Sequence, residues 1–129
     1  MGDFGLPFNF RIKMIDSRSA VWEPLRVLAS GAIDANYALI GDRLLNPTRI
    51  IDFINTCNET VFLSINGIDD HIVVPGNGGK TKDMCAARNG GDFSGLFVSA
   101  QTQFWVRCPS GPATGGSVYI EVIYSGLGD

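Results

Sequence analysis

Three consecutive polar residues, Asp69, Asp70 and His71, come nearest in this sequence to a metal or catalytic site. Two carboxylates and an imidazole together could bind a divalent cation. They follow Asn66 and Gly67, a pair that favours a tight turn, so they are expected at the end of a hairpin. Neighbouring residues of an extended chain point to opposite faces, which works against a shared ligand site. We interpret the cluster as a solvated turn, with a calcium site and a catalytic role as the alternatives.

Nucleophilic and phosphate chemistry have little support. His71 is the only histidine, so a serine or cysteine triad would depend on it alone, and the sequence has no G-x-S-x-G motif. Residues 76–81 end in Gly-Lys-Thr, similar to a phosphate-binding loop. However, Val74 stands where the full motif needs glycine, and no helix is expected after the segment. We interpret it as an ordinary loop and predict a protein that is not an enzyme and has no cofactor.

The three cysteines, Cys57, Cys85 and Cys108, leave at least one thiol unpaired. Their spacing contains no C-x-x-C pair, and a single histidine is available to complete a ligand set. This pattern does not fit a zinc site. We expect buried free thiols in a reducing compartment, and no metal.

Charge and hydropathy argue against nucleic acid and membrane as direct partners. The net charge is −3, and lysine and arginine are scattered rather than gathered into a basic stripe. No apolar run approaches the ~20 residues that span a bilayer. Residues 1–10 lack the charged and apolar regions of a signal peptide. We expect a soluble protein made in the cytoplasm.

The composition predicts one compact domain with many turns. A chain of 129 residues is one domain by size, and its hydrophobic fraction of 45% is enough for a core. Sixteen glycines beside a charged fraction of 18% indicate short strands joined by tight turns. So low a charge is typical of a protein whose surface contacts neighbouring proteins.

Apolar residues recur with the period of strands rather than of helices. The best helix candidate, residues 32–45, has its apolar residues poorly placed on one face and is interrupted by Gly41. The predicted strands are residues 8–15, 22–28, 49–55, 60–66, 71–74, 81–85, 101–108 and 117–124. The short link of residues 56–59 predicts a hairpin between the two strands that flank it.

The fold class follows from these strands. About eight or nine short strands separated by Gly/Pro turns predict an all-β protein, an antiparallel β-sandwich of jelly-roll-like type. Residues 75–80 and 109–116 are predicted loops. Residues 1–30 are less regular and are predicted to form an N-terminal arm with one or two strands, which could pack on a neighbouring subunit. Residues 31–129 are predicted to form the sandwich.

Outward aromatic side chains are the candidates for a protein interface. The alternation of residues 101–108 turns Trp105 outward between Gln103 and Arg107, and that of the last strand turns Tyr119 outward. Aromatic residues beside arginine are the composition of an interface centre. We therefore predict that these four residues lie in an interface. The alternative is that loops cover the outer faces of both strands.

Several short segments, taken in order, carry a resemblance to a known class. They are residues 35–44 (ANYALIGDRL), 47–51 (PTRII), 55–56 (NT), 64–67 (SING), 70–71 (DH) and 115–122 (GGSVYIEV). This ordered set resembles small virion structural proteins of tailed double-stranded DNA bacteriophages, whose pattern is "aY..iG..L", "I.N.T", "iS.DG" and "G.vYv.v.y". Asn66 stands where that pattern more often has aspartate, which argues further against a cation at the turn. The first ~30 residues match no part of the pattern.

The resemblance implies a particle component present in many identical copies, assembled in the host cytoplasm and located in the virion. Its partners would be copies of itself and other virion proteins, most plausibly at the head–tail junction or tail, in a fibre-seating or connector role. A capsid cement or decoration protein is the alternative within this class. A carbohydrate- or receptor-binding module, with a host-surface glycan as ligand, is the alternative from another class. An enzyme is the least favoured reading.

Overall fold

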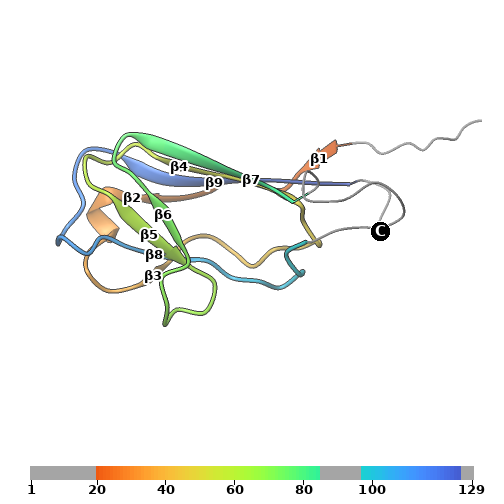
Figure 1. The fold of residues 1–129 in the computed structure, drawn as a ribbon, viewed down its shortest axis with the longest axis horizontal. Coiled ribbons are helices and arrows are strands. Elements are labelled where there is room, and N and C mark those ends of the chain that lie inside the picture. The colour runs from red at the N-terminus through yellow and green to blue at the C-terminus, as the bar shows by residue number, and fades with distance from the viewer. Residues whose placement is uncertain (1–19, 85–96, 126–129) are drawn as a thin grey trace, which may run out of the picture.

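The computed structural model describes residues 20–84 and 97–125 (Figure 1), and in them the fold is all-β, as predicted. Two antiparallel sheets lie one above the other as a sandwich. The first sheet contains β1 (Ala20–Trp22), β2 (Arg26–Ala29), β9 (Ser117–Ser125), β4 (Ile50–Asn55) and β7 (Gly78–Asp83). The second sheet has the order β3 (Ala38–Leu39), β8 (Trp105–Arg107), β5 (Val61–Ser64) and β6 (Ile72–Val74). The predicted strand at residues 8–15 lies outside the described residues.

The core lies between the two sheets and follows from alternation along the strands. Every second residue of β4 and β9 is buried, because successive side chains of a strand point to opposite faces. Phe53 of the first sheet meets Phe104, which precedes β8, edge to face with ring centroids 5.9 Å apart. Other fully buried members of this core are Ile33, Ile40, Leu44, Ile51, Leu63, Val106, Val118, Ile120 and Val122. The strands predicted at residues 49–55 and 117–124 are confirmed.

The hairpin predicted across residues 56–59 is wrong. β4 pairs with β7 and β9, whereas β5 pairs with β6 and β8, so the link passes from one sheet to the other. The buried Asn55 side chain fixes this crossing, because its amide donates to the backbone carbonyls of Glu59, Val74 and Pro75. Its Oδ1 accepts the Cys57 N–H. A buried amide with four partners specifies the path of the chain here.

Other predicted elements differ in their limits. The weak helix candidate at residues 32–45 contains the two-residue strand β3, preceded by a single 3-10 turn, Ser30–Ala32. The predicted loop at residues 75–80 is shorter, because β7 already begins at Gly78. The strand predicted at residues 101–108 is limited to β8. Within the described part of the chain there is no helix with the length and apolar character needed to cross a membrane.

The N-terminal boundary of the sandwich also differs from the prediction. β1 and β2 both pair antiparallel with β9, at opposite ends of that long strand. Residues 20–30 therefore belong to the first sheet rather than to an arm. Residues 1–19 of the predicted arm lie outside the described residues.

Candidate functional site

The outer face of the second sheet contains a compact cluster of Tyr37, Phe62, Asp70 and Arg107. Arg107 donates from Nε and Nη2 to the two carboxylate oxygens of Asp70, at 2.9 and 2.6 Å. The Tyr37 hydroxyl donates to the same carboxylate. The guanidinium lies 5.5 Å from the ring centroid of Tyr37 and 5.7 Å from that of Phe62. A bidentate ion pair between two aromatic rings gives the arginine a fixed orientation.

Electrostatics in this cluster favour the ionised pair. Hydrogen bonds from Arg107 and then Tyr37 lower the pKa of Asp70 to about 2. The same contact with Asp70 raises the pKa of Arg107, and partial burial followed by the bond to Asp70 raises the pKa of Tyr37. Asp70 is therefore a charged anchor at neutral pH and not a proton donor.

Trp105 lies on the same face but is not freely accessible. The turn at Gly67 lies over its indole ring, where an added Cβ would be 3.2 Å from Cε2, and the φ of this residue is +74°. The turn is held by Ser64 Oγ, which accepts from the backbone N–H groups of Asn66 and Gly67. Trp105 is half-buried as a result. At Trp105, therefore, a loop covers part of the outer face of β8, which was the alternative to an interface.

The three residues of the predicted turn, Asp69, Asp70 and His71, do not converge. Asp69 accepts from the side-chain amide of Asn66, Asp70 binds Arg107, and Nδ1 of His71 accepts the Ile65 N–H. No group of three or more His, Cys, Asp or Glu side chains placed to hold a metal occurs in residues 20–84 and 97–125. All three residues are exposed in a turn that is also held by hydrogen bonds of its own side chains.

Tyr119 lies on the opposite side of the molecule, on the outer face of the first sheet. It stands in register between Val27 of β2 and Ile54 of β4. A second row, four residues along β9, joins Trp22, Ile123 and Ile50. Trp22 is 63% exposed and Val27 48% exposed. Between the two apolar rows lies a polar row of Glu121, Asp52 and Thr81.

The four predicted interface residues thus do not form one surface. Trp105 and Arg107 lie on one face of β8 in the second sheet and Gln103 precedes that strand, whereas Tyr119 is on the first sheet. Arg107 is bound to Asp70, and Trp105 is partly covered by the turn. Tyr119 has an apolar neighbour on each adjacent strand, Val27 of β2 and Ile54 of β4.

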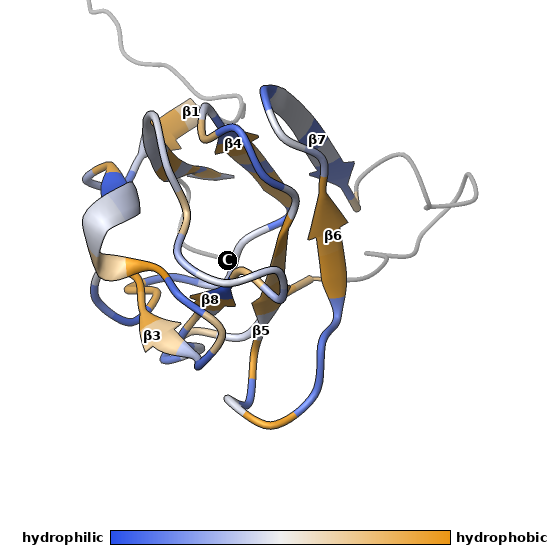
Figure 2. Cartoon of the chain, turned by 90° about the vertical axis from the view of Figure 1, so that its left-hand side faces the viewer, coloured by the Kyte–Doolittle hydropathy of each residue, from blue (hydrophilic) through white to orange (hydrophobic). Residues whose placement is uncertain are grey.

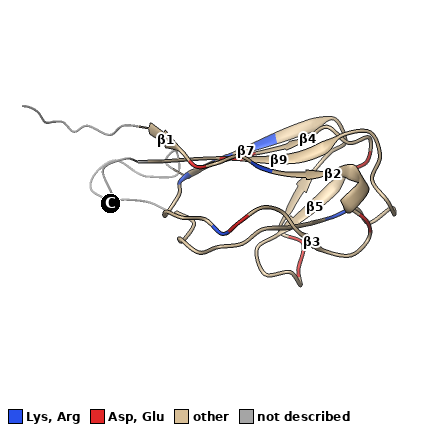
Figure 3. Ribbon diagram, turned by 180° about the vertical axis from the view of Figure 1, so that it is seen from behind, with Lys and Arg blue, Asp and Glu red and all other residues tan. Residues whose placement is uncertain are grey.

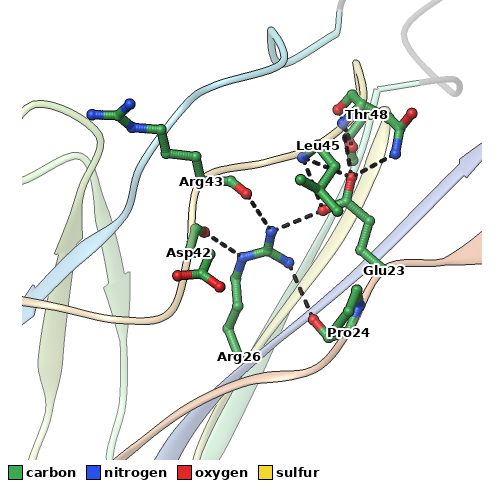
Figure 4. A network of polar contacts seen from close by, with 8 residues as sticks. Glu23, Pro24, Arg26, Asp42, Arg43, Leu45 and Thr48 are labelled. Carbon is green, nitrogen blue, oxygen red and sulfur yellow. Dashed lines mark hydrogen bonds and ion pairs between the residues drawn. The ribbon is translucent and has the colours of Figure 1, made fainter.

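A buried ion pair between Glu23 and Arg26 was not foreseen from the sequence (Figure 4). These residues are 6% and 4% exposed, and Nη2 of Arg26 donates to Glu23 at 2.8 Å. The guanidinium also donates to the backbone carbonyls of Asp42 and Arg43 at 2.8 and 2.9 Å. Gly41 packs on the arginine stem, where an added Cβ would lie 2.4 Å from Cγ. The pair therefore ties the start of β2 to residues 41–46.

The carboxylate of Glu23 is fully engaged. It accepts from the backbone N–H groups of Leu45 and Asn46 and from the Asn46 side chain. Burial raises the pKa of Glu23, but the hydrogen bonds from Arg26, Asn46 and Leu45 together lower it below its ordinary value. The sequence gives only a weak indication of this buried ion pair. Opposite charges three residues apart around a proline also occur on solvated surfaces.

One end of the sandwich is closed by three loops packed on one another. Thr114 donates from its backbone N–H and hydroxyl to Glu59, which lowers the pKa of that carboxyl. Gly76 packs against Asn58, where an added Cβ would lie 2.3 Å from the backbone carbonyl oxygen. Gly116 packs against Thr56, where an added Cβ would lie 2.3 Å from Oγ1. In the segment that is similar to a phosphate-binding loop, Gly76 therefore packs against another loop, and Gly78 and Gly79 begin the strand β7. No helix follows them directly.

The opposite part of the sandwich has an apolar opening of about 250 Å³ between the sheets. β6 and β7, joined by the turn at residues 75–77, belong to different sheets and diverge from that turn (Figure 1). The lining residues are Ile51, Phe53, Ile65, His71, Ile72, Lys82, Met84, Val98 and Phe104. Figure 2 shows that β6 is apolar and β7 is polar.

The described cysteines, Cys57 and Cys108, are buried free thiols. Burial raises the pKa of Cys57. Cys85 lies outside the described residues. Basic and acidic residues are distributed over both sheets and their loops rather than gathered on one face of the described chain (Figure 3).

Comparisons with protein-family models, with curated proteins and with solved structures find no match to this chain.

Proposed function

We propose that this protein is a structural subunit of a tailed-bacteriophage virion that works through contacts with copies of itself and with other virion proteins. The position in the particle that we favour is the head–tail junction or tail. The observation that carries the proposal is the outer face of the first sheet. Two apolar rows there, each crossing three strands, remain exposed or half-exposed in the single chain. Exposed apolar rows of this extent are typical of surfaces that bind another protein.

The shape of this face supports assembly by rigid contact. Val27, Tyr119 and Ile54 lie on three adjacent strands of one sheet, so they need no rearrangement to meet a partner. The acidic pair Asp52 and Glu121 separates the two rows, and a partner must place basic or polar groups opposite it. A flat apolar surface with a central polar row suits a specific subunit contact better than a small-molecule site.

The glycan-binding alternative loses its main support. It required an exposed tryptophan beside aspartates free to accept hydrogen bonds from sugar hydroxyls. Trp105 lies under the turn at Gly67, and Asp70 is already occupied by Arg107 and Tyr37. A sugar at Trp105 and Asp70 would have to displace an ion pair and a packed turn before it could bind.

Two valines at matched positions provide the test. Val27 is 48% exposed on the outer face of the first sheet, and Val73 is 39% exposed on that of the second. We expect the wild type to form oligomers in sedimentation velocity experiments. Val27→Glu should weaken association about tenfold or more by placing a charge in the apolar row, and Val73→Glu should have little effect. A wild type that stays monomeric at ~100 μM would refute the proposal, because its self-association would then be weaker than that of typical specific contacts.

A further inference from the structure

The outer edge of β7 from Gly78 to Lys82 is the longest strand edge that meets no other strand of the described residues. β7 has six residues and pairs with β4 along one side only. Its other edge, from Gly78 to Lys82, meets no strand of residues 20–84 or 97–125. An open edge presents a row of backbone N–H and C=O groups that another extended segment can pair with.

The apolar opening lies directly beside this edge. Lys82 of β7 and Met84, just after it, contribute to its rim, and Ile51, Phe53 and Ile72 contribute to its walls. A strand added along β7 would turn every second side chain toward this opening. Those side chains must be apolar, since the walls offer no hydrogen-bonding partner apart from His71 and Lys82 at the rim.

The side chains on the other face of an added strand would lie beside polar and acidic residues. It would continue the outer face of the first sheet, next to Thr81 and close to Asp52 and Glu121, which pair across β4 and β9. Basic side chains are favoured there. The β7 edge of another copy does not fit, because Lys80 and Lys82 point to the inner side and would face their counterparts.

Residues 8–15 have the required alternation. Phe8, Phe10, Ile12 and Met14 would share one face of a strand, and Asn9, Arg11 and Lys13 the other. We propose that this segment of one copy docks as an added strand on β7 of a second copy, with its apolar face over the opening and its basic face beside the acidic row. The inference rests on the self-association proposed above and adds a second contact to it.

Chain length favours a second copy over the same molecule. β1, where residues 8–15 connect, and a strand added outside β7 would be four strand positions apart, about 19 Å. The five peptide links from residue 15 to Ala20 span at most about 18 Å when fully extended. The whole segment therefore cannot lie beside β7 of its own chain.

Cross-linking between isotopically distinct chains tests this contact directly. A photoreactive phenylalanine analogue replaces Phe10 in the full-length chain, and light and heavy copies are mixed before irradiation. We expect cross-links to residues of β7 or the opening, such as Lys82 or Met84, in mixed light–heavy pairs. Cross-links only within one chain, or to sites away from β7, overturn the inference.

Paired substitutions separate the failure of this inference from that of the proposed function. Phe10→Ser should weaken self-association about tenfold, and the control Asn9→Ser should not. On β7, Thr81→Lys should weaken association by repelling Arg11 and Lys13, whereas Thr81→Glu should preserve it. Both lose the same hydrogen bond to Asp52. Oligomers unaffected by Phe10→Ser and Thr81→Lys refute arm docking but leave the proposed function standing, whereas a monomeric wild type refutes both.

Discussion

The molecule contains two arginine–carboxylate pairs of the same chemistry in opposite surroundings. Glu23 and Arg26 have side chains that are 1% and 4% exposed, whereas those of Asp70 and Arg107 are both 27% exposed. The buried pair bonds to six further groups, which are three backbone carbonyls, two backbone N–H groups and the Asn46 side chain, and the exposed pair adds the Tyr37 hydroxyl. Burial makes every partner necessary, because an unpaired charge cannot be hydrated there.

This difference predicts different roles. The buried pair joins the N-terminal strands to residues 41–46 and holds the end of the first sheet to the rest of the sandwich. The exposed pair orients one turn over the second sheet. Losing the first should therefore affect the whole fold, and losing the second only its own neighbourhood.

The largest effect is expected for Glu23→Ala. It leaves the Arg26 guanidinium buried without its carboxylate and removes the acceptor of Leu45 and Asn46, so unfolding should become easier by about 3–5 kcal/mol. Urea denaturation followed by circular dichroism measures this. The double variant Glu23→Ala/Arg26→Met should be less damaged than the single one, since no charge remains buried. Equal damage in both would contradict the argument.

A smaller effect is expected at Gly41, which packs against the same arginine. Gly41→Ala places a methyl group 2.4 Å from Arg26 Cγ at a φ of +69° and should cost about 2 kcal/mol. Gly31→Ala is the matched control, because nothing lies within 4 Å of its added Cβ. Gly111→Ala, at φ +117° in open space, separates backbone strain from the clash. Thermal melts that rank Gly31→Ala as the most harmful would count against the packing we describe.

The smallest effect is expected for Asp70→Asn. Its folded pKa of about 2 is below the ordinary 3.8, so the ionised pair contributes its full stability above pH 4 and loses it as the pH falls toward 2. The contribution should not exceed about 1 kcal/mol because the pair is exposed to solvent. Denaturation curves of wild type and variant should differ at pH 6 and coincide near pH 2. A difference that grows on acidification would show the opposite sign.

The strands were predictable from the sequence where one face is fully buried. In β4 and β9 alternate residues are all core, so the period of two is visible without any partner. The pairing of strands was not predictable. A four-residue link suits a hairpin and a crossing between sheets equally, and the choice depends on Asn55 bonding to Val74 and Pro75, twenty residues away.

The site residues show the same limit. The outward phase of Trp105 could be inferred from alternation, but its cover by Gly67 depends on how the turn folds back. The burial of Glu23 and Arg26 depends on carbonyl and N–H groups of residues 42–46, which no local pattern links to them. The period of apolar residues along a strand predicts which face is buried. It does not predict which distant backbone groups will form hydrogen bonds with a buried polar side chain.

The closed end of the sandwich has a consequence for how this sequence can diverge. Gly76 faces Asn58, Gly115 faces the Asn58 side chain, and Gly116 faces Thr56, with no room for a side chain at any of them. Each glycine is required by the backbone or side chain of another loop, so a change in one loop is compatible only with a change in its neighbour. These three loops should therefore vary together or not at all among descendants of this chain, and insertions should be excluded from them.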